Sequence, residues 1–124
     1  MGITDIGLQT MATLLGSNVN KPSYTAIGAG STAFDVSDNS LVSEGDRNTF
    51  TSTDFATSKE ITYVTDFSSV ELSGLTVSEH SVWNDSGLNI GSMFNREVLA
   101  GSLVFVGDRE LQIQTTFRLA RSGA

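Results

Sequence analysis

Few side chains in this sequence could carry out chemistry. The only histidine is His80, next to Glu79, and there is no cysteine. A zinc site needs three or four ligands, and no second histidine or any cysteine is present to supply them. Ser and Asp abound, so a Ser-His-Asp triad is formally possible, but no Gly-x-Ser-x-Gly elbow occurs. We therefore expect a non-enzymatic protein with no catalytic, cofactor or metal residue, and we expect His80 at an interface or on a surface-facing strand.

Two further patterns could hold a ligand. The stretch from Gly28 to Ala33 fits the G-x-G-x-x-A dinucleotide fingerprint, but that fingerprint needs a following helix, and the next residues show no helical period. We predict a strand-exit turn there, with glycine supplying a positive φ. A cluster of carboxylates in the segment 35–46 could offer oxygen ligands to calcium. The cluster lacks the D-x-D-x-D-G order of a calcium loop, so we favour a solvated loop and leave calcium binding open. Its carboxylates are Asp35, Asp38, Glu44 and Asp46.

Four aromatic residues lie in predicted strands: Trp83, Phe94, Phe105 and Phe117. If they were exposed in a row, they could form a sugar-binding platform. Aromatic residues in strands more often belong to a core or an interface, and we favour that interpretation. An exposed row would indicate a carbohydrate-binding module, whereas a row buried at a subunit contact would indicate an assembling protein.

The start of the chain has a helical pattern. Thr4 or Asp5 can cap a helix over about residues 4–15, and Gly16 follows where a left-handed stop is expected. Apolar residues recur at i, i+3, i+4 and i+7, so one face should pack on the rest of the domain. The residues of that predicted face are Leu8, Met11, Ala12 and Leu15.

From residue 24 onward the apolar period is two, which is typical of strands. The last strand is the clearest, because apolar and polar residues alternate from Leu111 to Leu119. The segments 17–23 and 35–46 read as loops, with Leu41 anchoring the second. A single domain spanning residues 1–124 is predicted, mainly β, as an antiparallel jelly-roll-like β-sandwich with one short N-terminal helix. The predicted strands cover residues 24–27, 49–55, 61–67, 75–77, 81–83, 93–98 and 111–119.

Charge and hydropathy exclude some partners. The formal net charge is −7, which argues against binding nucleic acid through its phosphates. No apolar run approaches the roughly 20 residues of a membrane span. The first residues lack the basic start and long apolar stretch of a signal peptide, so we expect synthesis in a cytoplasm.

Three stretches together resemble a known family. The start, Thr4-Asp5-Ile6-Gly7-Leu8, is similar to the opening of small virion structural proteins of tailed bacteriophages. The stretch from Tyr24 to Ala33, followed by Leu41, Glu44 and Arg47, resembles their "Y-x-A-I-G-x-G-x-T-A … L … E … R" pattern. The segments 79–84 and 91–98 resemble "E-W-G-V-F-N … G-T-M-L-N-R-K-V", and Gly107-Asp108 before Leu111 fits the closing "G-D-x-L-x-I". The sequence departs from the family at His80 and Ser81.

The resemblance implies a virion protein, described for such families as a head-fibre, decoration or tail-fibre protein. We expect a homo-oligomer, with a trimer as the candidate state, that binds other virion proteins such as the major capsid protein, with no cofactor and no nucleic acid or membrane partner. We favour a capsid decoration or turret-like subunit, made in the host cytoplasm and located in the virion. A tail or baseplate component and a carbohydrate-binding module remain alternatives. The expected interface or structural residues are Trp83, Phe94, Arg96, Phe117, Leu8, Met11 and Leu15.

Arg96 lies in the best-matched stretch. On a strand it would share one face with Phe94 and Val98, among apolar neighbours. A buried arginine is seldom left unpaired, because an uncompensated charge costs several kcal/mol. We therefore expect a carboxylate partner for Arg96, and the candidates are Glu79, Asp85 and Glu44.

Overall fold

The computed structural model describes residues 2–16, 21–57, 60–88 and 90–118. The chain is mainly β, with 50% strand and 12% helix, as predicted. No helix within these residues is long and apolar enough to cross a membrane. The elements in chain order are β1 (Gly2–Ile3), α1 (Asp5–Gly16), β2 (Tyr24–Gly28), β3 (Glu44–Thr49), β4 (Ser52–Thr57), β5 (Glu60–Phe67), α2 (Ser69–Leu72), β6 (Thr76–Trp83), β7 (Asn95–Val104) and β8 (Leu111–Arg118).

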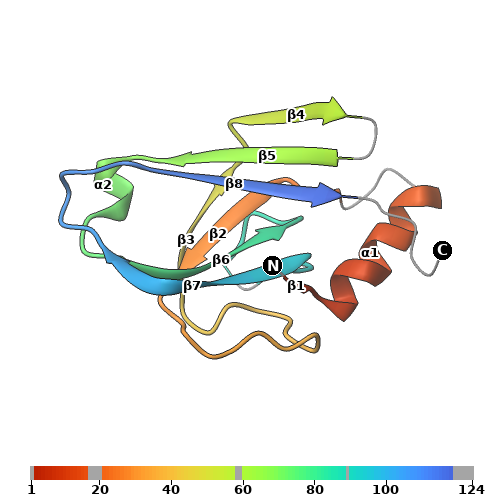
Figure 1. Ribbon diagram of the computed structural model, residues 1–124, viewed down its shortest axis with the longest axis horizontal. Helices are drawn as coiled ribbons and strands as arrows, with labels where there is room; N and C mark the ends of the chain where they lie inside the picture. The colour runs from red at the N-terminus through yellow and green to blue at the C-terminus, as the bar shows by residue number, and fades with distance from the viewer. Residues whose placement is uncertain (1, 17–20, 58–59, 89, 119–124) are drawn as a thin grey trace.

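The strands form two antiparallel sheets (Figure 1). The larger sheet has the order β1-β7-β6-β2-β3, and the smaller has the order β4-β5-β8. Figure 1 shows α1 at one end of the pair and α2 at the other. The two antiparallel sheets agree with the sequence-based prediction, whereas the jelly-roll-like type stays a prediction.

The core is built from side chains of both sheets. One cluster joins Ile27 and Val77 of the larger sheet to Phe67 and Ile113 of the smaller sheet. A second cluster lies toward α1, whose Met11 and Leu14 pack against it. Its buried members are Tyr63, Val82, Phe94 and Phe117.

The N-terminal helix is capped as predicted, but its buried face is shifted by one position. The Thr4 hydroxyl accepts a hydrogen bond from the Gly7 amide at 2.9 Å, and it donates to the Met93 carbonyl. Leu8, expected on the packed face, is 55% exposed. The covered residues are instead Gly7, Thr10, Met11 and Leu14, while the side chains of Ala12 and Leu15 lie outside the described residues.

Gly7 explains the shift. A Cβ at this position would overlap the Phe94 backbone, so the helix approaches β7 through its smallest residue. A pattern that counts only large apolar residues therefore selects the wrong face.

The predicted strands at 24–27, 61–67 and 111–119 correspond to β2, β5 and β8, with Leu119 outside the described residues. The alternation in β8 is confirmed, because Ile113, Thr115 and Phe117 are buried and the residues between them are exposed. The predicted strand at 49–55 is wrong in extent. There the chain leaves β3 at Thr49 and enters β4 of the other sheet at Ser52.

Other elements also differ from the sequence-based expectation. Strand β7 runs from Asn95 to Val104 where 93–98 was predicted, and β3 begins at Glu44, inside the segment 35–46 that was predicted as a loop.

The predicted fragments 75–77 and 81–83 are a single strand, β6, in which every residue after Thr76 is buried. The short helix α2 was not predicted. It begins with a capping box, in which Ser68 and Glu71 exchange side-chain-to-backbone hydrogen bonds of 3.2 and 3.0 Å.

Phe117 allows a direct test of the two-sheet core. Its ring is 7% exposed and lies edge-on to Tyr63, with 6.0 Å between the ring centroids. Phe117→Ala should lower the free energy of unfolding by about 3–5 kcal/mol in urea titrations. The control Thr116→Ala, on the exposed face of the same strand, should change it by less than about 1 kcal/mol. Equal effects of the two substitutions would contradict this packing.

Candidate functional site

The outer face of the larger sheet is covered by residues 29–43, which we call the covering loop (Figure 1). The loop is fixed by Glu79 on β6, whose side chain is fully buried. The Glu79 carboxylate accepts hydrogen bonds from the backbone amides of Gly30 at 2.7 Å, Val42 at 3.0 Å and Ser43 at 2.9 Å. One side chain of the sheet thus holds both ends of the loop.

Arg96 on β7 completes this arrangement. Its Nε donates to Glu79 Oε1 at 2.9 Å, and its Nη1 lies 3.2 Å from an Asp38 oxygen in the covering loop. The predicted pairing with Glu79 is confirmed, whereas Asp85 and Glu44 were wrong candidates. Phe94 does not share the face of Arg96, because it packs in the cluster with Val82 and Phe117. We call Glu79, Arg96 and Asp38 the loop anchor.

The glycines of the dinucleotide-like stretch serve the loop anchor. Neither Gly28 nor Gly30 has a positive φ, so the expected reason for glycine was wrong. A Cβ on Gly28 would lie 2.7 Å from a Glu79 carboxylate oxygen, and one on Gly30 would lie 2.5 Å from it. The nearest atoms belong to the covering loop, with the Ser43 carbonyl oxygen 2.5 Å from the Cβ on Gly28 and Val42 Cβ nearest to the Cβ on Gly30. Close approach of both the loop and the carboxylate therefore excludes larger residues.

A second buried arginine lies on the same face. Arg47 of β3 forms two hydrogen bonds with the Glu44 carboxylate, at 2.7 and 2.8 Å. Its Nη1 donates to the carbonyls of Asp85 and Ile90, and its guanidinium lies 3.9 Å from the centroid of the Trp83 ring. Arg47 therefore ties the loop between β6 and β7 to the sheet. Apart from its place in the family-like stretch, nothing in the sequence marked this residue.

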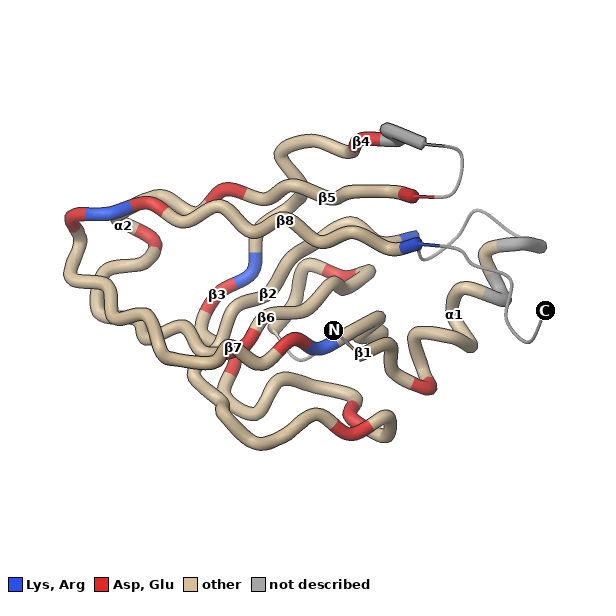
Figure 2. Tube along the Cα trace, viewed as in Figure 1, with Lys and Arg blue, Asp and Glu red and all other residues tan. Residues whose placement is uncertain are grey.

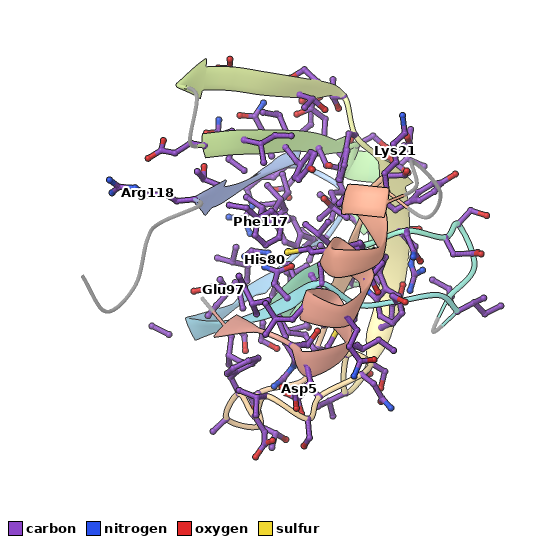
Figure 3. All side chains as sticks on the ribbon, turned by 90° about the vertical axis from the view of Figure 1, so that its right-hand side faces the viewer. Asp5, Lys21, His80, Glu97, Phe117 and Arg118 are labelled. Atoms are coloured by element: carbon purple, nitrogen blue, oxygen red, sulfur yellow. The ribbon has the colours of Figure 1, made fainter. Side chains whose placement is uncertain are left out.

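His80 is buried, so it is not on a surface-facing strand, which was one of its two expected positions. It is 9% exposed, and in Figure 3 its label lies at a level between those of Phe117 and Glu97. Burial lowers its pKa below 6.5, and the opposing charge of Glu97 only partly offsets that effect. Its Nδ1 has no hydrogen-bond partner among the described residues. The imidazole is thus enclosed by the fold on a strand, β6, that is buried along nearly its whole length.

The carboxylates considered for calcium do not converge. Asp35 accepts hydrogen bonds from Ser37, which lower its pKa, while Asp38 belongs to the loop anchor and Glu44 to Arg47. Among the described residues no group of three His, Asp or Glu side chains could hold a metal ion. The acidic residues are therefore used within the fold.

The four aromatic residues predicted to belong to a core or an interface are covered by the chain itself. Trp83 and Phe94 are fully buried, Phe105 is 3% exposed, and Phe117 is 7% exposed. They form neither an exposed sugar-binding row nor a surface for a second subunit. Arg96 is likewise internal and Met11 is half-buried, while the Leu15 side chain lies outside the described residues. Of the expected interface or structural residues whose side chains are described, only Leu8 is exposed.

Four of the ten large aliphatic side chains that are exposed among the described residues lie at the α2 end of the molecule. Val70, Val104 and Val106 are 84%, 58% and 73% exposed, and Leu103 is 39% exposed. Their segments are joined, because the Gly74 amide donates to the Phe105 carbonyl and the Phe105 amide donates to the Leu75 carbonyl. We call these four residues the aliphatic ridge. The uncharged run from Val98 to Gly107 was the sequence signal that could have found it.

Gly30 tests how tightly the loop is held. Gly30→Ala would place a Cβ against Val42 and Glu79, and should cost about 1–3 kcal/mol of unfolding free energy by overpacking. In the control Gly45→Ala, the new Cβ would meet its nearest neighbour, Leu75, at an ordinary 3.5 Å. That variant should be neutral or slightly more stable than the parent in urea titrations. A neutral Gly30→Ala would show that the loop is free to move.

Glu79 predicts a pH dependence. Burial opposes its ionisation, but hydrogen bonds from Ser43, Val42, Arg96 and Gly30 outweigh burial and lower its pKa below 4.5. Because the pKa of Glu79 is lower in the folded state than in the unfolded state, its ionised carboxylate stabilises the fold above about pH 4.5. This stabilisation is lost as the pH falls through the folded-state pKa. Glu79→Gln should cost about 3–5 kcal/mol at neutral pH, because Arg96 loses its buried partner.

Unfolding titrations across the acid range measure this contribution. The unfolding free energy of the parent should fall more steeply below pH 4.5 than that of Glu79→Gln. Parallel curves for the two proteins would mean that Glu79 does not stabilise the fold as a carboxylate.

The chain was compared with protein-family models, curated proteins and solved structures, and none of the three gave a match. The resemblance to small virion proteins thus stays a hypothesis drawn from the sequence. The structure adds two features to the sequence. On the outer face of the larger sheet, the buried Glu79–Arg96 pair holds the covering loop and the buried Arg47, paired with Glu44, holds the loop between β6 and β7. The aliphatic ridge lies at the α2 end.

Proposed function

We propose that this protein is a non-enzymatic structural component of the virion of a tailed virus, assembling in several copies on the particle. A capsid decoration or turret-like role is preferred over a tail or baseplate role, and the jelly-roll-like sandwich is part of the proposal. The aliphatic ridge carries the argument. Exposed aliphatic side chains that lie together on a folded domain typically mark a contact with another protein.

The way in which polar groups are used also supports assembly. Glu79, Arg96, Glu44 and Arg47, which could otherwise bind a ligand, are committed to buried pairs within the chain. Such pairs fix loops without presenting reactive groups. A carbohydrate-binding role receives no comparable support, because the aromatic residues it would use are buried.

The proposal is tested on particles of the virus that encodes the chain. Quantitative mass spectrometry of gradient-purified particles should find the chain in a fixed ratio to the major capsid protein. Antibodies against the purified chain should label the head exterior. Recovery of the chain only in the soluble fraction of the lysate would overturn the proposal, and labelling confined to the tail would overturn the decoration role.

The ridge is tested with particles that lack the chain. Val106→Glu places a charge on a 73% exposed ridge residue, so the recombinant variant should fold normally but bind particles at least about tenfold more weakly. Val36→Glu, at a 54% exposed position in the covering loop, is the matched control and should bind like the parent. Equal binding by both variants would exclude the ridge as the docking surface.

A further inference from the structure

The outer edge of β8 is open. β8 is the last strand of the smaller sheet, and among the described elements only β5 runs alongside it. Its residues from Leu111 to Arg118 are in unbroken register with β5. From Leu111 to Phe117 it has no charge and no proline, and Figure 2 shows this uncharged strand ending at Arg118. A regular, uncharged edge is a template on which another strand can form.

The other described edges are protected in the ways that natural edge strands use. β1 has two residues, and β7 beyond it has a register shift against β6. β4 has a register shift against β5 and carries Asp54. β3 carries Glu44, Asp46 and Arg47. Of the described edges, β8 alone has neither a bulge nor a charge in its middle.

Alternate residues of β8 direct their backbone groups to the open side. The Val64 carbonyl of β5 accepts a hydrogen bond from the Thr51 amide, so Val64 faces β4 and not β8. Its register partner on β8 is Gln114, whose N–H and C=O therefore point away from β5. The same holds two residues away in each direction, at Gln112 and Thr116. None of these backbone groups has a hydrogen bond to another described residue.

The inner face of β8 has an unsatisfied polar group as well. Thr115 is 3% exposed, and its hydroxyl has no hydrogen-bond partner in the described part of the chain. On an added strand, the residue opposite Thr115 would lie on the same inner face. That pair would be of the non-hydrogen-bonded kind, in which the side chains are closer. A Thr or Ser at that position would supply the missing partner, as in the Thr pairs of natural sheets.

The two ends of β8 have opposite charges. Glu110, just before the strand, is exposed, and the Arg118 side chain at its end is 68% exposed. The Arg118 Nε lies 3.8 Å from a Glu60 oxygen, and most of the guanidinium is in contact with solvent. An antiparallel strand that starts with an acidic residue and ends with a basic residue matches both charges.

We propose that β8 accepts an extended segment of a partner protein as a fourth, antiparallel strand of the smaller sheet. The segment has an acidic residue opposite Arg118, a hydroxyl residue opposite Thr115, an aliphatic residue opposite Ile113 and a basic residue opposite Glu110. This edge is separate from the aliphatic ridge. If the chain is a virion protein, the segment is an extended arm of a neighbouring virion protein, and only this last identification rests on the proposed function.

A single strand fits this edge better than a second copy of the chain. Two copies joined about a two-fold axis through β8 would share one inner face, so both larger sheets would lie on the same side. In Figure 1, β7 and β1 lie on the side of β8 that is turned away from β5, so the larger sheet extends past the open edge. The larger sheets of the two copies would overlap there. An extended segment brings no second layer.

Amide exchange followed by NMR tests whether the edge is open. The amides of Gln112, Gln114 and Thr116 should exchange rapidly in the free protein, because no group accepts from them. The amides of Ile113 and Thr115 bond to β5 and should exchange at least about tenfold more slowly. Slow exchange of all five amides would show that the edge is already occupied, and would overturn the proposal.

A synthetic peptide tests strand addition. The capped peptide EVTTQVTVK, in one-letter code, places its Glu opposite Arg118, its second Thr opposite Thr115 and its Lys opposite Glu110. Its binding, measured by fluorescence anisotropy, should slow the exchange of the three outward amides. The control KVTTQVTVE, with the end charges exchanged, should bind at least about tenfold more weakly. No binding of EVTTQVTVK at millimolar concentration, or equal binding of both peptides, would overturn the proposal.

Variants of β8 give the reciprocal test. Gln114→Pro removes the central outward N–H without breaking a hydrogen bond to β5, so it should fold but lose the peptide. Gln114→Ala keeps the N–H and should bind like the parent. The double variant Glu110→Lys with Arg118→Glu changes two exposed charges and should prefer KVTTQVTVE. Equal peptide binding by Gln114→Pro and Gln114→Ala, or an unchanged preference of the double variant, would contradict strand addition at β8.

The same measurements separate a partner segment from a second copy. Self-association that protects the amides of Gln112, Gln114 and Thr116, and that is lost in Gln114→Pro, would assign the edge to a second copy and overturn the proposal. The particle experiments report separately, because peptide binding at β8 does not depend on the particle. A chain that is absent from particles but binds EVTTQVTVK refutes only the proposed function.

Discussion

The buried pair between Glu79 and Arg96 is the interaction on which the outer half of this protein depends. The Glu79 carboxylate accepts hydrogen bonds from three backbone amides of the covering loop and from the Arg96 guanidinium, and these donors replace much of the hydration that burial removes. Without Arg96 the carboxylate would be a buried charge with no counter-ion. Without the amides the pair would contact the loop only through Asp38. Gly28 and Gly30 follow from the same constraint, because only glycine leaves room for the carboxylate and the loop.

This arrangement makes β6 an unusual central strand. Its middle residues Ser78, Glu79, His80 and Ser81 are polar, yet all are buried. On one face Ser78 donates to the Gly30 carbonyl, and Ser81 accepts a hydrogen bond from the Trp83 indole at 2.6 Å. On the other face His80 lies between the sheets. On the loop side β6 is therefore held by hydrogen bonds of Ser78 and Glu79 and by the apolar cluster that contains Trp83 and Leu41, and on the other side by the apolar clusters between the sheets.

Where apolar alternation governs burial, the sequence predicts the structure well, as in β5 and β8. Prediction fails where polar groups replace apolar ones. The sequence-based prediction divided β6 into two fragments, because the polar residues in its middle interrupt the apolar pattern. No periodicity indicates that backbone amides of residues 30, 42 and 43 will surround Glu79. The helix face was misassigned for a related reason, since contact through Gly7 leaves no apolar signal. For the candidate site, the rule that a buried arginine needs a carboxylate predicted Glu79 correctly. The aliphatic ridge was not predicted, because exposed valine and leucine residues on a strand have the same sequence pattern as buried ones.

The hydroxyl of Thr4 bonds to the backbone at Met93, 89 residues further along the chain, and β5 pairs with β8 from Glu60 opposite Arg118. Contacts at such sequence separation form late, because long loops must close before any of them is made. During synthesis, the smaller sheet cannot be completed until residue 118 has left the ribosome. Until then β5 and β4 have no third strand, and the apolar residues of β5 have no β8 beside them. A chain shortened by the length of β8 loses one strand of the smaller sheet together with the buried side chains of Ile113 and Phe117, and the apolar residues this exposes on β5 favour aggregation.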